Sequence, residues 1–269
     1  MLALARKLDS VTIREAGPAP REALLRVHSA SYLDMLRTVA EQGGGVLDPD
    51  TSMSAGSWTA ALSGAGAVLA AVDHALSGSG SAFAAVRPPG HHALACQAMG
   101  FCLLANVVIA AREAQTRGCR RILIVDWDVH HGNGTQALVE QDPGIRFVSL
   151  HQWPLWPGTG AAAERGVGNV WNVPREAGLP PARYLEDLWI GIEVATEGWI
   201  PDLVLISAGY DSMRGDPLGG FTLEPGHYGE WVRRLRGRTP AVPIVAALEG
   251  GYAPDRVALG VEATLHALA

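Results

Sequence analysis

The stretch RILIVDWDVHHGNG, which runs from Arg121 to Gly134, joins an apolar run to a polar cluster. The run Arg121–Val125 has the length and continuous hydrophobicity of a parallel strand that is buried on both faces. Two carboxylates and two imidazoles follow between Asp126 and His131, next to a glycine turn that lets the backbone approach closely. Oxygen and nitrogen ligands that converge at a strand end predict a metal site.

Apolar runs of strand length alternate with longer helical patterns along the rest of the chain. The candidate strands are Ala82–Val86, Arg121–Val125, Arg146–Leu150, Leu203–Ser207 and Ile244–Leu248. The candidate helices are Ser57–Leu76, Phe101–Gln115, Pro181–Thr196, Glu224–Leu235 and Pro254–Leu268. This order predicts a doubly wound α/β fold with a mostly parallel sheet and helices on both faces. The Gly/Ser tract 77–81 completes one helix-to-strand step, so we expect a single domain over residues 1–269.

The composition is compatible with an enzyme and argues against nucleic-acid and membrane partners. With 269 residues and 48% hydrophobic content, the chain can bury a large core. The net charge of −6 argues against direct nucleic-acid binding, because no basic stripe is present to follow a phosphate backbone. Charge interrupts the N-terminus early, and we expect no apolar run long enough to cross a bilayer, which predicts a cytoplasmic protein without a membrane partner. The three cysteines lack C-x-x-C spacing, so neither a disulfide framework nor a thiolate zinc site is indicated. The sequence does not indicate whether the protein is a monomer or an oligomer.

Polar clusters follow every candidate strand. They are Arg87–His92, Asp126–Asn133, Ser149–His151, Ala208–Asp211 and Glu249–Tyr252. All lie at carboxyl ends of strands, where open α/β sheets bind their ligands. A lone histidine or aspartate at one of these places is more often structural, but five such clusters predict a shared site.

The segments RPPGHH, DWDVHHGNGT, SLHQWPLWPGTG, SAGYDSMRGDPLGG and LEGGY together resemble the histone deacetylase superfamily. The resemblance runs from about Glu22 to the C-terminus and implies an arginase-like α/β fold. The superfamily includes acetylpolyamine amidohydrolases and acetoin-utilisation proteins. Within it, Asn133 and Glu249 resemble the class II branch and its bacterial relatives.

The resemblance implies a catalytic zinc ion held by Asp128, His130 and Asp211. Two carboxylates and one neutral imidazole leave a coordination position open for water and a substrate carbonyl, as a catalytic zinc site requires. Arginase-like manganese chemistry is an alternative on the same architecture, but the carboxylates for a second metal are not evident in the sequence.

The resemblance also implies the residues of an acid–base mechanism. His92 is the general base and then the acid for the departing amine, while His91 orients and balances charge. Their partners would be Asp126 for His91 and Asn133 for His92. Because an amide does not stabilise a cationic ring as a carboxylate does, we expect His92 to be the less basic ring. Tyr252 would stabilise the oxyanion.

An acyl channel and a second ion follow from the same resemblance. Gly100, Phe101 and Trp156 match positions that enclose a lysine alkyl chain, and Leu218 matches an apolar rim residue. Packing within its own loop is an equal alternative for Trp156. If this bulky ring lines the channel, it would narrow it. A structural potassium ion would be held by groups of Asp126, Asp128, His130, Ser149 and Leu150.

Some histidines are expected to lie outside the catalytic set. His131 follows His130 directly, and successive residues of an extended segment point to opposite sides, so we expect it to pack or to support the site. Structural or surface roles are likewise expected for His28, His74, His151, His227 and His266.

The start of the chain departs from the family. Relatives begin with a strand and an H-P-E-R-like loop before the helix expected here at Leu2–Lys7, and this chain has neither. We expect the missing strand to come from inside the sheet, where its loss would leave unpaired backbone groups or force its neighbours together. Either the true start lies upstream, or the sheet has closed again and the site has a wider mouth. An ordered strand filling the gap from Met1 to Ile13 would contradict both hypotheses.

The substrate expected from the resemblance is an acetylated lysine side chain or an acetylated small amine such as a polyamine. Asp48 and Asp50 could face the opening, hydrogen-bond a peptide backbone, or form a turn with Pro49. A protein that binds acyl-lysine or a small molecule without catalysis is the rival function. The set Asp128, His130, Asp211, His92 and Tyr252 is complete, which favours catalysis.

Overall fold

A six-stranded parallel sheet forms the centre of the molecule in the computed structural model, which describes residues 5–269. The strands lie in the order β3-β8-β7-β4-β5-β6. Their bounds are β3 Ala82–Ala84, β4 Ile122–Asp126, β5 Ile145–Gln152, β6 Val170–Arg175, β7 Leu203–Ala208 and β8 Ile244–Leu248. Because all the pairings are parallel, the carboxyl ends of the strands meet at one edge of the sheet.

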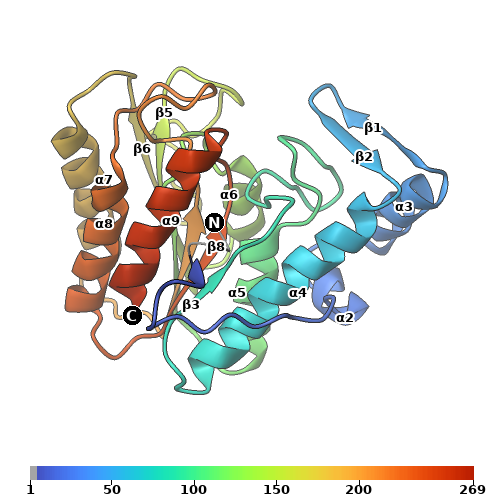
Figure 1. The fold of residues 1–269 in the computed structure, drawn as a ribbon, viewed down its shortest axis with the longest axis horizontal. Helices are drawn as coiled ribbons and strands as arrows, with labels where there is room; N and C mark the ends of the chain where they lie inside the picture. Colours follow the sequence, from blue (N-terminus) through green and yellow to red (C-terminus); the bar gives the residue numbers. More distant parts are fainter. Residues whose placement is uncertain (1–4) are drawn as a thin grey trace.

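Helices cover both faces of this sheet (Figure 1). One face carries α7 (Pro181–Ala195), α8 (Pro225–Arg238) and α9 (Pro254–Leu268), and the other carries α4 (Ser57–Leu76), α5 (Asn106–Thr116) and α6 (Asn133–Val139). Leu123 and Val125 of β4 pack toward the first group, whereas Ile122 and Ile124 pack toward the second. Alternate residues of β4 therefore pack into two hydrophobic cores, one on each face of the sheet, which explains why this strand is apolar throughout. The arrangement confirms the predicted doubly wound α/β fold.

Most predicted elements agree with the structure at their centres. The bounds predicted for α4, α9 and β8 agree with those observed, and β3, β4, β5 and β7 differ by one or two residues at an end. The helix predicted from Phe101 begins instead at Asn106, because Phe101 adopts a left-handed backbone conformation with φ 64°. Strand β6 and helix α6 were not predicted.

A small N-terminal layer, also not predicted, packs beside α4. It contains α2 (Arg21–Leu25), α3 (Ala30–Glu41) and an antiparallel hairpin of β1 (Gly44–Asp48) and β2 (Thr51–Ser54). Figure 1 shows this hairpin projecting at one corner of the molecule. The hydroxyl of Tyr32 donates to the carbonyl of Leu103 at 2.8 Å, and the amide of Ala105 donates to Nε2 of His28 at 3.0 Å. The layer thus supports the loop that joins β3 to α5.

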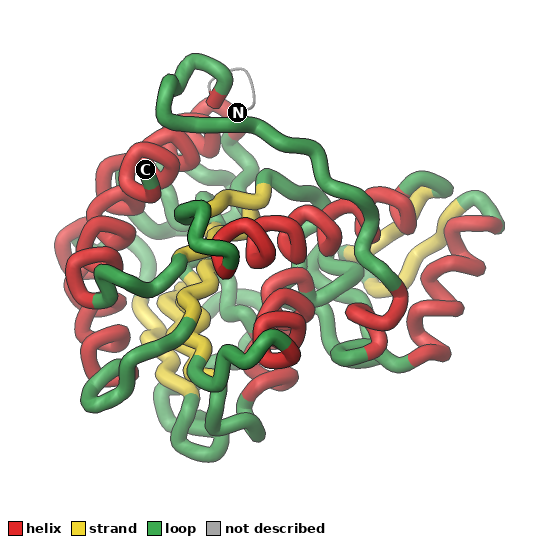
Figure 2. Tube along the Cα trace, turned by 90° about the horizontal axis from the view of Figure 1, so that it is seen from below, coloured by secondary structure: helices red, strands yellow, loops and turns green. Residues whose placement is uncertain are grey.

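The segment before α2 runs as an extended loop along the outside of α4 (Figure 2). Ala19 donates its amide to the carbonyl of Leu62 at 2.9 Å. A Cβ atom on Gly66 would lie 2.0 Å from the carbonyl oxygen of Gly17, so this close approach requires glycine.

The expected gap inside the sheet is absent from the described residues. Residues 5–20 form no strand, and β3 is an edge strand of an uninterrupted sheet. β3 and β6 are the two edge strands, and residues 5–13 supply no gap-filling strand, so neither hypothesis about the start of the chain is contradicted. The helix expected at Leu2–Lys7 lies partly outside the described residues.

Helix α4 corrects one expectation about membranes. Its 20 residues are long and apolar enough to cross a bilayer by length and composition alone, contrary to the sequence-based expectation. Ala65, Val68 and Val72 on this helix are fully buried within the protein. Contacts with β3 and α5 on its buried face are those of a core helix.

Candidate active site and metal centre

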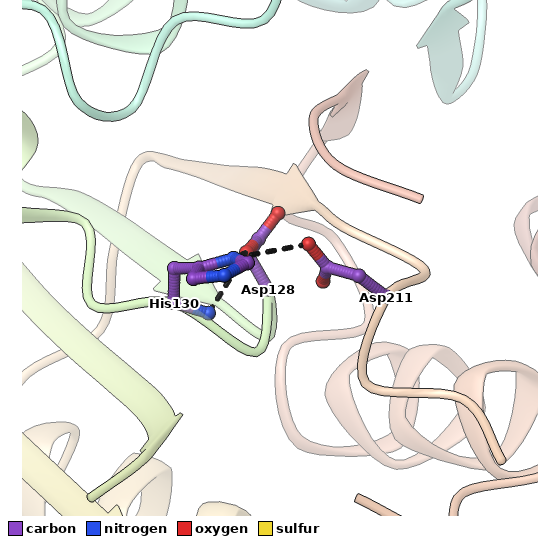
Figure 3. Close-up of side chains that lie close together, drawn as sticks. All are labelled: Asp128, His130 and Asp211. Atoms are coloured by element: carbon purple, nitrogen blue, oxygen red, sulfur yellow. Dashed lines mark hydrogen bonds and ion pairs between the residues drawn. The ribbon is translucent and has the colours of Figure 1, made fainter. Parts of the chain in front are cut away.

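Asp128, His130 and Asp211 converge at the carboxyl ends of β4 and β7, with one ligand atom from each within 4.8 Å of the others. The Nδ1 atom of His130 lies 3.1 Å from Oδ1 of Asp128 and 3.2 Å from Oδ2 of Asp211 (Figure 3). Because β4 and β7 are neighbouring parallel strands, residues far apart in sequence leave the sheet side by side. The two carboxylates are completely buried.

Backbone amides fix both carboxylates. Asp211 Oδ1 accepts from the amide of Val129 at 2.9 Å, and Asp128 Oδ2 accepts from the amide of Gly250 at 2.8 Å. A Cβ on Gly250 would lie 2.2 Å from Oδ2 of Asp211, so a side chain there would displace this ligand. Two carboxylates and one imidazole held in this way form a donor set that suits zinc with an open position.

The electrostatics of the three residues show how strongly they interact. Burial raises the pKa of Asp211 to about 7, whereas at Asp128 the neighbouring His91 and His130 rings outweigh burial and lower the pKa below its usual range. Burial opposes a charge on His130, but its hydrogen bonds to the two carboxylates raise its pKa to about 10. Without a metal, a proton on His130 therefore compensates the buried negative charge, and a bound cation would replace it.

His91 and His92 stack beside this cluster with ring centroids 3.8 Å apart. His91 Nδ1 lies 3.0 Å from Oδ2 of Asp126, and His92 Nδ1 lies 2.7 Å from Oδ1 of Asn133. At His91, burial is outweighed by the charges of Asp128 and Asp126, so its pKa is raised well above the usual value. Burial and the neighbouring charge of His91 hold the pKa of His92 well below that value. Two adjacent imidazoles therefore differ in charge at neutral pH.

Tyr252 follows β8 and faces the same edge of the sheet. Its amide donates to Oδ2 of Asp216 at 2.7 Å, and the other oxygen of Asp216 accepts from the amide of Leu218 at 3.0 Å. Gly251 adopts φ 139°, a conformation that L side chains rarely adopt, and so allows the chain to turn between β8 and Tyr252. Burial and the charge of Asp128 raise the pKa of Tyr252, so its hydroxyl remains a donor.

Gly100 and Phe101 lie between the histidines and the surface. A Cβ on Gly100 would come within 2.3 Å of the His92 ring and 2.6 Å of the Trp156 ring, so these groups are in close contact. The Phe101 and Tyr252 rings meet edge to face at 5.9 Å. Phe101, Trp156 and Leu218 are each about 40% exposed, as residues at a rim would be.

The β1–β2 hairpin holds this rim in place. Asp50 Oδ1 accepts from the amide of Gly100 at 3.1 Å, and Thr51 Oγ1 accepts from the amide of Phe101 at 3.0 Å. Pro49 and Asp50 form the turn of the hairpin, which supports the turn interpretation of the Asp48–Asp50 segment. Sequence reasoning missed Thr51 and Asp216 as supports of the site. Asp216 lay within a quoted motif, whereas Thr51 carried no signal.

The other expected residues occupy distinct places. Ser149 pairs with Asp126 across β5 and β4, and Leu150 follows it in the buried strand. His131 contacts Thr159 Oγ1 at 2.8 Å through Nδ1 and Gln136 Oε1 at 2.9 Å through Nε2. Both nitrogens of His131 are thus engaged away from the ligand cluster, as its adjacency to His130 predicted.

A cluster that could hold a metal ion and an adjacent histidine pair thus lie at the carboxyl edge of a parallel sheet, where open α/β folds bind their ligands. The chain belongs to the histone deacetylase family, because the histone deacetylase domain matches residues 1–268. This confirms the resemblance seen in the motifs.

Individual relatives agree with this assignment. An uncharacterized protein of Synechocystis is 46% identical over 91% of this chain and 81% of its own length. The histone deacetylase-like amidohydrolase of Pseudomonas aeruginosa is 37% identical over 89% of this chain, and the match spans 66% of that relative. A probable deacetylase of Methanothermobacter thermautotrophicus is 38% identical over 90% of this chain and 74% of its own length. The crystal structure of the HDA15 HD domain superposes with a TM-score of 0.90 at 35% identity, covering 95% of this chain and 74% of that one.

Proposed function

We propose that the protein is a zinc-dependent deacetylase that hydrolyses an N-acetyl or N-acyl amide on a lysine-like or polyamine amine and releases the carboxylic acid. The observation that carries this proposal is the convergence of Asp128, His130 and Asp211 beside two histidines of opposite charge preference. Membership of the histone deacetylase family supports the reaction class.

Zinc fits the ligand set, because two carboxylate oxygens and one imidazole nitrogen leave a fourth position open. When bound, zinc supplies Lewis acidity, which polarises an amide carbonyl and lowers the pKa of a water molecule. The proposal also includes a structural potassium ion held by groups of Asp126, Asp128, His130, Ser149 and Leu150. The pairing of Asp126 with Ser149 on neighbouring strands supports that second site.

The hydrogen bonds of the histidine pair assign their protons. The carbonyl of Asn133 accepts, so His92 carries its proton on Nδ1 and leaves Nε2 free as a base. His92 would take a proton from water at Nε2 and pass it to the departing amine. His91 stays cationic between Asp126 and Asp128, which keeps His92 neutral before the reaction begins.

Tyr252 supplies a donor for the oxygen on which negative charge develops, since its hydroxyl stays protonated. Gly100, Phe101 and Trp156 would enclose the alkyl stem of the substrate, and Leu218 would contact it at the rim. The apolar character of these residues suits an uncharged stem with its acyl group innermost.

We propose one catalytic domain over residues 1–269 acting in the cytoplasm. The free thiols of Cys96, Cys102 and Cys119 support a reducing compartment.

Hydrolysis of a fluorogenic acetyl-lysine reporter by the zinc-loaded protein tests the proposal. We expect turnover in the wild type and a loss of about 10² to 10³ in kcat for Tyr252→Phe, the usual effect of removing one oxyanion donor. His92→Ala should lose at least as much, because the base is gone. Equal rates in the three proteins would refute the mechanism, and binding without turnover in the wild type would favour the non-catalytic alternative.

A panel of acetyl-lysine peptides, acetylspermidine and acetylputrescine, compared by kcat/KM, ranks the substrate classes. A preference for the small amines would assign an acetylpolyamine amidohydrolase, and a preference for peptides would assign a protein deacetylase.

A further inference from the structure

Glu249 is a buried carboxylate that is not one of the assigned ligand or acid–base residues. It follows β8, is 6% exposed, and reaches the turn that carries the histidine pair. Its Oε2 accepts from the amide of Gly90 at 2.6 Å and from the amide of His91 at 3.1 Å, while Oε1 accepts from the hydroxyl of Ser207 at 3.2 Å. One side chain therefore joins β7, β8 and the histidine turn.

The turn that carries His91 and His92 depends on the Glu249 side chain, which is the acceptor for two of its backbone amides. The carbonyl of Gly90 accepts from Ala93, and the carbonyl of His91 accepts from Thr135 at 3.0 Å. The two amides of Gly90 and His91 have Glu249 as their partner. Buried amides without an acceptor are costly, so the side chain is needed for the turn to keep this conformation.

The adjacent residue extends the connection to the metal cluster. The amide of Gly250 donates to Oδ2 of Asp128, so residues 249 and 250 contact both the histidine turn and a proposed zinc ligand. The distance between the base and the ligand cluster is thereby set through one rigid segment that leaves β8. Small errors in such a distance have large kinetic effects, since a displacement of about 1 Å can cost 10²-fold in rate.

We infer that Glu249 is a positioning residue for the acid–base pair, acting through the hydrogen bonds that its carboxylate accepts from Gly90 and His91. The inference rests on the proposed deacetylase function. Glutamine offers a carbonyl oxygen in place of Oε2, and the Ser207 hydroxyl can rotate to accept from its amide. Glu249→Gln should therefore keep the conformation of the turn. Glu249→Ala removes the acceptor for the Gly90 and His91 amides and should destabilise that conformation.

Steady-state kinetics at pH 8 on the zinc-loaded protein test the catalytic consequence. We expect Glu249→Gln to retain kcat within about threefold, and Glu249→Ala to lose about 10²-fold in kcat with KM and zinc content unchanged. Asp187→Ala is the matched control, because Asp187 is also 6% exposed but lies on α7 and pairs with Arg175 and Arg183 rather than with the histidine turn. The control should lose stability without this loss of kcat.

Hydrogen exchange at residues 88–92 gives a readout that does not depend on turnover. Glu249→Ala should exchange the amides of Gly90 and His91 about tenfold faster, and Glu249→Gln and Asp187→Ala should not. Unchanged exchange in Glu249→Ala, or equal losses in the alanine and glutamine variants, would overturn the inference. If the wild type shows no turnover, the proposed function fails while the exchange result still decides the role of Glu249.

Discussion

Replacing Asn133 by aspartate tests the protonation of the histidine pair directly. The change keeps the shape of the side chain and places a negative charge 2.7 Å from Nδ1 of His92. A carboxylate at this range typically raises the pKa of a neighbouring histidine by about 1 to 3 units. In the wild type, burial and the charge of His91 hold the pKa of His92 well below its usual value, so the ring is ready to act as a base.

The sign of the effect follows from the role of the ring. If neutral His92 is the base, kcat/KM falls as pH drops through the pKa of His92. Asn133→Asp should therefore move the acidic limb of the kcat/KM profile upward by about 1 to 3 pH units, equivalent to about 1.4 to 4 kcal/mol. Well below both limbs the variant should be about 10- to 10³-fold slower than the wild type. Above both limbs the two rates should converge.

The assay is the reporter reaction from pH 5 to 9, with zinc content and circular dichroism recorded at each pH. Gln152→Glu is the matched control, because Gln152 ends β5 and bonds the amide of Gly220 rather than a histidine. Its profile should resemble that of the wild type. An acidic limb that stays in place, or moves downward, in folded and zinc-loaded Asn133→Asp would show that this partner does not control the base.

Three further predictions concern the rim, the metal and stability. Thr51→Val removes the acceptor for the Phe101 amide and should raise KM for an acetyl-lysine peptide about fivefold with little change in kcat, as measured by initial rates. Zinc binding at pH 7 should release about one proton from His130, because the pKa of this ring is raised to about 10. Calorimetry in buffers of different ionisation enthalpy measures this proton release. Binding heats that are the same in all buffers would contradict the prediction. Burial lowers the pKa of His28 to about 4, so its contribution to stability is present above the unfolded value of 6.5 and is lost as pH falls toward 4. In His28→Gln the loss of unfolding free energy between pH 7 and 4.5, measured by urea titration, should be smaller by about 2 kcal/mol.

The sequence predicted those parts of the molecule whose signals are local. The continuous apolar run before Asp126 predicts a buried strand, because residues on both faces of that strand pack into a hydrophobic core. Polar residues at strand ends indicated a shared site because parallel strands end at one edge. The set Asp128, His130 and Asp211 came from the family resemblance, and the structure brings these three side chains together.

The parts that could not be predicted depend on partners distant in sequence. The sequence pattern predicts a helix from Phe101, but the left-handed conformation of this residue is held by Thr51, fifty residues earlier. Strand β6 contains Asn172 and Pro174, which weaken its apolar pattern, and it lies at the edge of the sheet where such residues are tolerated. Glu249 belonged to a recognised motif, yet its contact with Gly90 spans 159 residues and has no local signature.

The order of strands in the sheet also has a consequence for synthesis. β4 leads to Asp128 and His130, but Asp211, which follows the neighbouring strand β7, is made 81 residues after His130. A growing chain on the ribosome therefore presents two of the three ligands before their partner exists, and the Gly250 amide that fixes Asp128 comes later still. Such long-range pairings form slowly and late in folding. We expect tight metal capture to await the finished polypeptide, so that metal retention reports that β7 and β8 have joined the sheet.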